Sequence, residues 1–138
     1  MNIDGVNNGI VLDHIKAGSS MEIYHLLRLD EVDAAVAIIQ NVESRKYGKK
    51  DIIKIDEIID IDLDVLGYVD PNITVNIVRN RQLSVKKHLE LPLTLRNVLR
   101  CKNPRCITTT EQEIEQIFYL VDPESKLYRC TYCESDAT

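Results

Sequence analysis

Apolar positions in the first ninety residues follow two different periods, one typical of strands and one typical of helices. Residues 10–15, 51–56 and 73–78 are short apolar runs rich in Ile and Val. Branched side chains favour strands because they pack well on a pleated surface. These three runs are therefore predicted to be strands.

Two further segments complete the predicted strands. Residues 33–42 are apolar enough for a central strand, although their alanines leave a helix open, and residues 82–87 form a weaker strand. Polar residues 43–50 read as a hairpin turn in which Gly48 is available for positive φ. Asp70, Pro71 and Asn72 make a second turn.

Helical spacing occurs twice between these strands. Ile23, Leu26 and Leu27 recur at helical spacing, which predicts a helix over residues 20–29. Ser19 precedes Glu22 by three positions, the arrangement of a reciprocal capping box. Residues 61–69 predict a second, shorter helix.

The resulting order, βαββαβ with an extra strand at its end, predicts an α+β fold. We expect a ferredoxin-like sandwich in which two helices cover one face of an antiparallel sheet. Pro92 lies where the pattern stops, so we expect one domain over residues 1–91 and another over 92–138. The second is expected to be a small β-rich domain that needs an additional cross-link such as a metal ion, because it has little apolar area to bury.

Composition narrows the classes of partner. The chain has 138 residues, with 22 acidic against 17 basic side chains, one Phe and no Trp. This balance repels phosphate backbones and provides few rings for base stacking, so no nucleic acid is expected. The chain has neither an eighteen-residue apolar run nor an N-terminal signal peptide. We therefore expect a cytoplasmic protein with no membrane partner.

The cysteines form two close pairs near the C-terminus. They are Cys101, Cys106, Cys130 and Cys133. A reducing cytosol favours metal ligation over disulfides, and each pair can present two thiolates from one turn. Four soft ligands without an open position predict one structural Zn²⁺ per chain. The alternatives are an iron-sulfur cluster and four thiols that pack as small apolar groups.

Together with the predicted order of the two domains, five short motifs resemble the regulatory chain of aspartate carbamoyltransferase, and they occur in the same order as in that family. They are VLDHI at residues 11–15, GKKDIIKI at 48–55, TVNIV at 74–78, NVLRCKNPRC at 97–106 and CTYCE at 130–134. The resemblance implies a subunit with no active site, which controls pyrimidine biosynthesis. It implies a homodimer that binds CTP, UTP or ATP in its N-terminal domain. The zinc domain would contact the catalytic chain, with Asn103 and Arg105 at the interface.

The resemblance also implies an effector site. It assigns Lys86 and His14 to the triphosphate, Lys54 and Asp13 to ribose and base, Val11, Asn76 and Leu83 to the pocket wall, and Ile3, Gly5 and Val6 to a segment closing over the base. This chemistry is reasonable, because a triphosphate needs cationic donors and a base needs a flat apolar wall with a few directed polar atoms.

The residues alone leave other interpretations open. Lys54 could lie on the polar face of an alternating strand, and Asp13 with His14 could hold the turn after their strand. Lys86 belongs to a run that could simply be solvated. A zinc-ribbon nucleic-acid-binding protein and a small acid-base enzyme are the rival classes of function.

Four features of the sequence depart from the family pattern. Arg81 and Val85 replace an aromatic residue and a glycine, and Arg105 replaces an asparagine at the interface. The chain also ends five residues after Cys133. We expect these departures to affect which nucleotide the chain prefers as its effector.

Overall fold

The computed structural model describes residues 6–45, 48–111 and 113–137. The chain divides into two compact units, Met1–Glu90 and Leu91–Thr138, and the expected boundary lies one residue further along. Within the described ranges, none of the helices has the length and apolar character that crossing a lipid bilayer requires.

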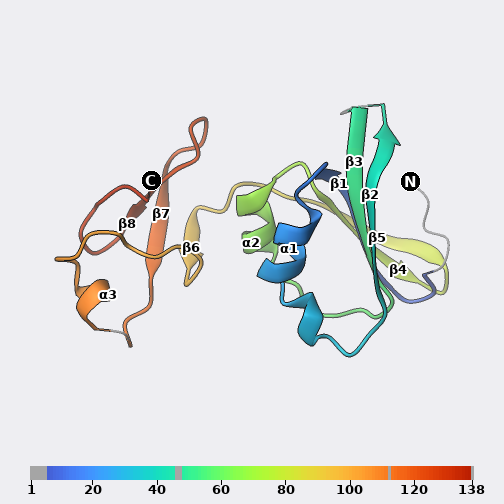
Figure 1. Ribbon diagram of the computed structural model, residues 1–138, viewed down its shortest axis with the longest axis horizontal. Coiled ribbons are helices and arrows are strands. Elements are labelled where there is room, and N and C mark those ends of the chain that lie inside the picture. The colour runs from blue at the N-terminus through green and yellow to red at the C-terminus, as the bar shows by residue number, and fades with distance from the viewer. Residues whose placement is uncertain (1–5, 46–47, 112, 138) are drawn as a thin grey trace. The chain divides into compact units, whose positions relative to one another are not determined.

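The N-terminal unit is a five-stranded antiparallel sheet in the order β2-β3-β1-β4-β5. Its strands are β1 (Gly9–Lys16), β2 (Val36–Ser44), β3 (Gly48–Ile55), β4 (Thr74–Arg79) and β5 (Gln82–His88). Helices α1 (Ser20–Leu26) and α2 (Leu63–Val69) lie side by side against one face of the sheet (Figure 1). The predicted ferredoxin-like sandwich with an extra strand is confirmed.

The strand predictions hold because tertiary packing agrees with local propensity. Most of the segment that left a helix open lies in strand β2, which pairs with β3 on both sides of a bulge between Ile39 and Val42. Ser44 pairs with Gly48, whose φ of 77° is the left-handed conformation that a glycine adopts without strain. The hairpin between the two strands is therefore confirmed, but its turn is shorter than the predicted residues 43–50, since β2 extends to Ser44 and β3 begins at Gly48.

Two predictions about α1 are wrong. The helix ends at Leu26 instead of residue 29, because Arg28 is left-handed at φ 53° and a short 3₁₀ turn, η1 (Leu29–Glu31), follows. The capping box is absent within the described residues: Ser19 has helical backbone angles and its side chain makes no capping hydrogen bond. The Asp51 carboxylate accepts the nearby N–H groups of Gly18 and Ser20 instead.

The main core of this unit lies between the sheet and the helices. Its buried members are Ile10, Leu12, Ile15, Ile23, Leu29, Ile53, Ile55, Leu66, Ile73 and Val75. A smaller apolar cluster of Val6, Val11, Ile52 and Val78 lies apart from it. Each fully buried aliphatic side chain stabilises the fold by roughly 1.5–3 kcal/mol. The N-terminal unit therefore has a substantial apolar core of its own.

The C-terminal unit is a three-stranded antiparallel sheet, confirming the expected small β-rich domain. Its strands are β6 (Thr94–Arg96), β7 (Ile117–Asp122) and β8 (Leu127–Cys130), and one turn of helix, α3 (Ile107–Thr110), precedes β7. Few large apolar side chains are buried in the described part of this unit, chiefly Leu95, Phe118 and Tyr128. The Tyr128 hydroxyl donates a 2.6 Å hydrogen bond to the Pro92 carbonyl, which ties the start of this unit to its sheet.

Candidate metal centre and ligand-binding face

Strand register aligns four of the expected effector-site residues in one row across the N-terminal sheet. Val11 on β1 lies opposite Lys54 on β3 and Asn76 on β4, and Asn76 lies opposite Lys86 on β5. Directly opposed residues project from the same face of a sheet. The two helices cover the other face, since the alternate side chains Ile53, Ile55 and Val75 pack in the main core. The row therefore lies on the face that the helices leave open.

The row combines a buried middle, formed by Val11 and Asn76, with cationic ends. Val11 is fully buried, and the Asn76 amide donates a 3.2 Å hydrogen bond to the Val11 carbonyl. Lys86 is exposed, and Lys54 is half-buried. Two ammonium groups on either side of a buried valine and a buried amide suit an anionic ligand that also has a planar part with a few polar atoms.

Asp13 and His14 lie at an irregularity in β1. The register shifts between Leu12 and Ile15, and His14 is left-handed at φ 60°. Asp13 Oδ1 accepts the His14 N–H at 2.6 Å and forms an ion pair with Lys50 Nζ at 2.9 Å. The Asp13 side chain is fully buried, yet its Oδ2 has no hydrogen-bond partner among the described residues.

Asp13 Oδ2 is the strongest sign in the described part of this unit that a hydrogen-bond donor binds here. A buried acceptor without a hydrogen bond costs about 1–3 kcal/mol, so native proteins rarely leave one unsatisfied. A ligand hydroxyl or an ordered water would satisfy it. Lys50, which holds the other oxygen, was not expected from the sequence, because its pairing depends on the alignment of β3 with β1.

His14 lies near the row, three residues along β1 from Val11. Its Nδ1 bonds Thr74 Oγ1 at 2.7 Å, and Thr74 pairs with His88, two residues beyond Lys86. His14 also lines a cavity of about 750 Å³. The other described lining residues are Lys16, Ala17, Ser19, Gly48, Lys49, Val69, Asp70 and Asn72. Neither Lys54 nor Lys86 belongs to that lining.

Of the remaining expected residues, Leu83 and Val6 lie beside the row. Leu83 pairs with Val78, one step along the same face, and is 46% exposed. Val6 is buried with Val11 and Val78. Ile3 and Gly5 lie outside the described residues. The Arg81 side chain donates to Asn7 Oδ1 at 2.5 Å, so the β4–β5 turn is attached to the segment that precedes β1.

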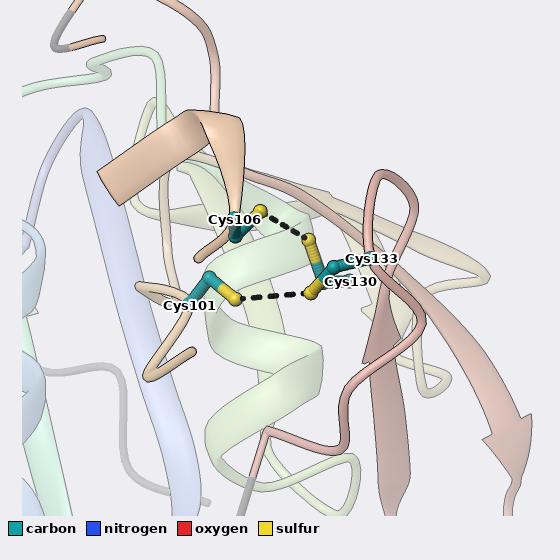
Figure 2. Close-up of side chains that lie close together, drawn as sticks. All are labelled: Cys101, Cys106, Cys130 and Cys133. Carbon is teal, nitrogen blue, oxygen red and sulfur yellow. Dashed lines mark hydrogen bonds between the residues drawn. The ribbon is translucent and has the colours of Figure 1, made fainter. Parts of the chain in front are cut away.

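The cysteines meet at a single point in the C-terminal unit (Figure 2). Their four sulfurs all lie within 4.8 Å of one another. Cys101 Sγ is 3.4 Å from Cys133 Sγ, and Cys106 Sγ is 3.7 Å from Cys130 Sγ. Tetrahedral ligation with metal–sulfur bonds of about 2.3 Å places sulfurs about 3.8 Å apart. The thiols therefore fit a four-coordinate metal ion and are too far apart for disulfides.

The surroundings of the thiols also fit a cation. Burial raises the pKa of Cys101 to about 12, whereas hydrogen bonds from the Ser135 side chain and backbone lower the pKa of Cys133 to about 6. The Thr108 hydroxyl lies 3.1 Å from Cys106 Sγ. Hydroxyl groups beside sulfur can donate to thiolates, and a bound cation stabilises all four in the ionised form.

Asn103 and Arg105 occupy the loop between the first two ligands. Asn103 Oδ1 accepts the Arg105 N–H at 3.0 Å, and its carbonyl accepts the Cys106 N–H at 3.1 Å. Its amide nitrogen also donates to Ser135 Oγ at 3.4 Å. Asn103 is half-buried and Arg105 is exposed. Asn103 thus shapes the loop, while Arg105 projects from it.

This geometry defines a protein built from a ferredoxin-like domain and a small four-cysteine metal-binding domain. Two family models match it in the same order. The allosteric domain of the aspartate carbamoyltransferase regulatory chain matches residues 1–90, and the metal binding domain of that chain matches residues 94–138. The chain belongs to the family of aspartate carbamoyltransferase regulatory chains, as its five motifs indicated.

Curated relatives support this assignment along nearly the whole chain. An aspartate carbamoyltransferase regulatory chain from Clostridium botulinum strain Hall is 52% identical over 134 residues, which cover 97% of this chain and 92% of the relative. The corresponding chain from Clostridium tetani is 50% identical, with 97% and 94% covered. That from Bifidobacterium longum is 44% identical, with 99% of each covered. The relatives are regulatory chains, so this chain is a non-catalytic subunit with an allosteric domain and a metal-binding domain.

Proposed function

We propose that this chain is the allosteric subunit that binds CTP, UTP or ATP and thereby controls aspartate carbamoyltransferase catalytic chains in pyrimidine biosynthesis. The allosteric domain is assigned to residues 1–91 and the partner-binding metal domain to 92–138. The observation that carries the proposal is the row of Lys54, Val11, Asn76 and Lys86 on the open face of the sheet. The proposal includes a cytoplasmic homodimer that associates through the allosteric domain.

Each group in the row has a chemical task in nucleotide binding. Lys86 and His14 supply cationic or polar donors for the triphosphate, and Lys54 addresses the ribose and base. Asp13 Oδ2, buried and without a partner among the described residues, accepts a ribose hydroxyl. Val11, Leu83 and the segment around Ile3, Gly5 and Val6 supply the apolar surroundings of the base.

The proposed metal is one structural Zn²⁺ per chain, held by the four cysteines. Four thiolates with no open position suit zinc and leave no site for a reacting water. The ion orders the loop that contains Asn103 and Arg105, and this loop presents contacts to the catalytic chain. Effector binding acts on the partner only to the extent that it favours one state of the assembly, typically by about 1–3 kcal/mol.

The effector site can be tested with two neighbouring lysines on β5. Lys86 lies opposite Asn76 on the open face, whereas Lys87 lies opposite Val75, whose side chain belongs to the core on the other face. Lys86→Ala should weaken CTP, UTP and ATP together by about 10-fold or more, because a charge-assisted hydrogen bond contributes roughly 1.5–3 kcal/mol. Lys87→Ala removes the same charge from the same strand and should change these affinities little.

Calorimetric titration of both variants against the three nucleotides measures this difference. Equal affinities for wild type and Lys86→Ala would overturn the site. Tight binding by wild type without any effect on the activity of the assembled enzyme would overturn the allosteric mechanism and leave the site intact.

The partner surface can be tested in the first cysteine loop. Arg105→Ala should weaken binding to the catalytic chain without changing metal content, because the side chain is exposed and its backbone contacts are kept. Asn103→Ala should weaken assembly and also loosen the loop, because it removes the acceptor for the Arg105 N–H. Unchanged assembly in both variants, measured by sedimentation with the catalytic chain, would exclude this loop from the interface.

A further inference from the structure

Gln116, immediately before β7, is the centre of a hydrogen-bond network in the metal-binding unit. Its Oε1 accepts the Cys101 N–H at 3.0 Å, and its Nε2 donates to the Thr108 carbonyl at 3.1 Å. Its backbone N–H donates to Asn97 Oδ1 at 3.0 Å, and its carbonyl accepts the Asn97 N–H at 2.7 Å. One carboxamide thus joins two points of the chain that flank the first pair of cysteines.

Both points are attached to thiols of the metal centre. The first is the backbone of Cys101 itself. The second is Thr108, whose hydroxyl lies 3.1 Å from Cys106 Sγ. Because the carboxamide is planar and its two hydrogen-bonding atoms are fixed relative to each other, it sets the separation between these two points. The positions of Cys101 and Cys106 are therefore coupled through Gln116.

The surroundings of Gln116 favour a local effect when its carboxamide is removed. Gln116 lines a polar cavity of about 560 Å³, together with Asn97, Arg100 and Thr108 among others. Water in such a cavity can satisfy the Cys101 N–H and the Thr108 carbonyl, so the unit keeps its polar groups hydrogen-bonded. Water does not, however, fix the distance between the Cys101 N–H and the Thr108 carbonyl, as the carboxamide does. The expected consequence is a looser set of ligands instead of an unfolded domain.

We propose that Gln116 is a positioning residue of the metal centre: its carboxamide holds Cys101 and the Thr108 segment where four sulfurs close around the ion, and so slows loss of the metal. The inference rests on the metal site of the proposed function. Partners that orient metal ligands typically change metal affinity by about 10- to 100-fold when mutated.

Two variants distinguish the two hydrogen bonds of the Gln116 carboxamide. Gln116→Met keeps the length of the side chain and removes both hydrogen bonds. Gln116→Glu keeps an acceptor for the Cys101 N–H and loses the donor to Thr108. Gln82→Ala, at an exposed position on β5, is the control. The full-length chain is loaded with Zn²⁺ or Co²⁺, and metal release to a chelator, affinity by competition and the visible spectrum of the cobalt form are measured.

We expect Gln116→Met to release zinc about 10-fold faster or more, and its cobalt ligand-field bands to shift. Gln116→Glu should lie between it and wild type, because half of the contact remains. Wild-type release and an unchanged cobalt spectrum in Gln116→Met would overturn the inference. So would a lower melting temperature with an unchanged spectrum, since it shows only general support of the fold. Failure of wild type itself to bind either metal would overturn the proposed metal centre instead.

Discussion

The two units of the chain are stabilised by different kinds of interaction. Among its described residues, the N-terminal unit buries ten aliphatic side chains in its main core, between the sheet and two helices. In the described part of the C-terminal unit, the buried large side chains are chiefly Leu95, Phe118 and Tyr128, and three of the four cysteines are buried beside them. The first unit depends on apolar burial, whereas the second depends on its thiols and the ion that they hold.

This difference separates the two tasks of a regulatory chain. A unit with its own core should keep the proposed ligand-binding face folded when the metal is lost. A unit of fewer than fifty residues needs a metal ion or another cross-link to present a rigid surface. Damage to either unit should therefore have distinct consequences, which three substitutions can test.

Cys130→Ser should have the largest effect. Cys130 is fully buried, and a structural zinc site contributes on the order of 10 kcal/mol to the folding of a small domain. We expect loss of metal and of binding to the catalytic chain, with nucleotide binding retained. Hydrogen exchange should show fast exchange beyond residue 91 and native protection in β1, β3 and β4. Loss of protection in both units would show that the N-terminal unit does not fold independently.

Leu66→Ala should reverse this pattern. Leu66 is fully buried on α2, and removal of its side chain leaves a cavity that costs about 2–5 kcal/mol. Chemical denaturation should show a less stable N-terminal unit, while metal content and the cobalt spectrum stay at wild-type values. Leu93→Ala, at a position 78% exposed, is the matched control. A change in metal content would mean that the metal site depends on the N-terminal core.

Asp51→Asn should have the smallest effect of the three. The Asp51 carboxylate accepts the N–H groups of Gly18, Ser20 and Asn41, and so holds the β1–α1 turn to the bulge in β2. Replacement by the amide turns one acceptor into a donor that faces these N–H groups, so we expect a loss of about 1–3 kcal/mol in the N-terminal unit alone.

This loss should depend on pH. Burial raises the pKa of Asp51, but hydrogen bonds from the Ser20 side chain and from the Asn41, Gly18 and Ser20 backbone together bring it below 3.8. A native pKa below that of the unfolded chain gives stability that is present above about pH 3.8 and is lost as the pH falls through the native pKa. The difference in unfolding free energy between wild type and Asp51→Asn should therefore shrink in acid. If the difference in unfolding free energy stayed constant as the pH fell below 3.8, the stabilising role of the ionised Asp51 carboxylate would be contradicted.

The sequence allowed most of the fold to be predicted because its signals are local. β-Branched runs predicted the strands around Val11, Ile53 and Val75. The cysteine spacing predicted the metal centre for a similar reason, since two residues close in the chain approach one ion together. The motifs around these elements then indicated the family.

Other features depend on residues that are far apart in the chain. Ser19 and Glu22 have the spacing of a capping box, yet Asp51, more than thirty residues away, accepts the N–H groups at the start of α1. The ion pair of Lys50 with Asp13 and the contacts of Gln116 with Cys101 and Thr108 likewise have no local signal. The sequence by itself determined most of the elements, the four-cysteine cluster and the family. Only the tertiary structure decided the row across the sheet, the buried Asp13 oxygen and the hydrogen bonds of Gln116, because strand register and loop packing are set by the free energy of the whole fold.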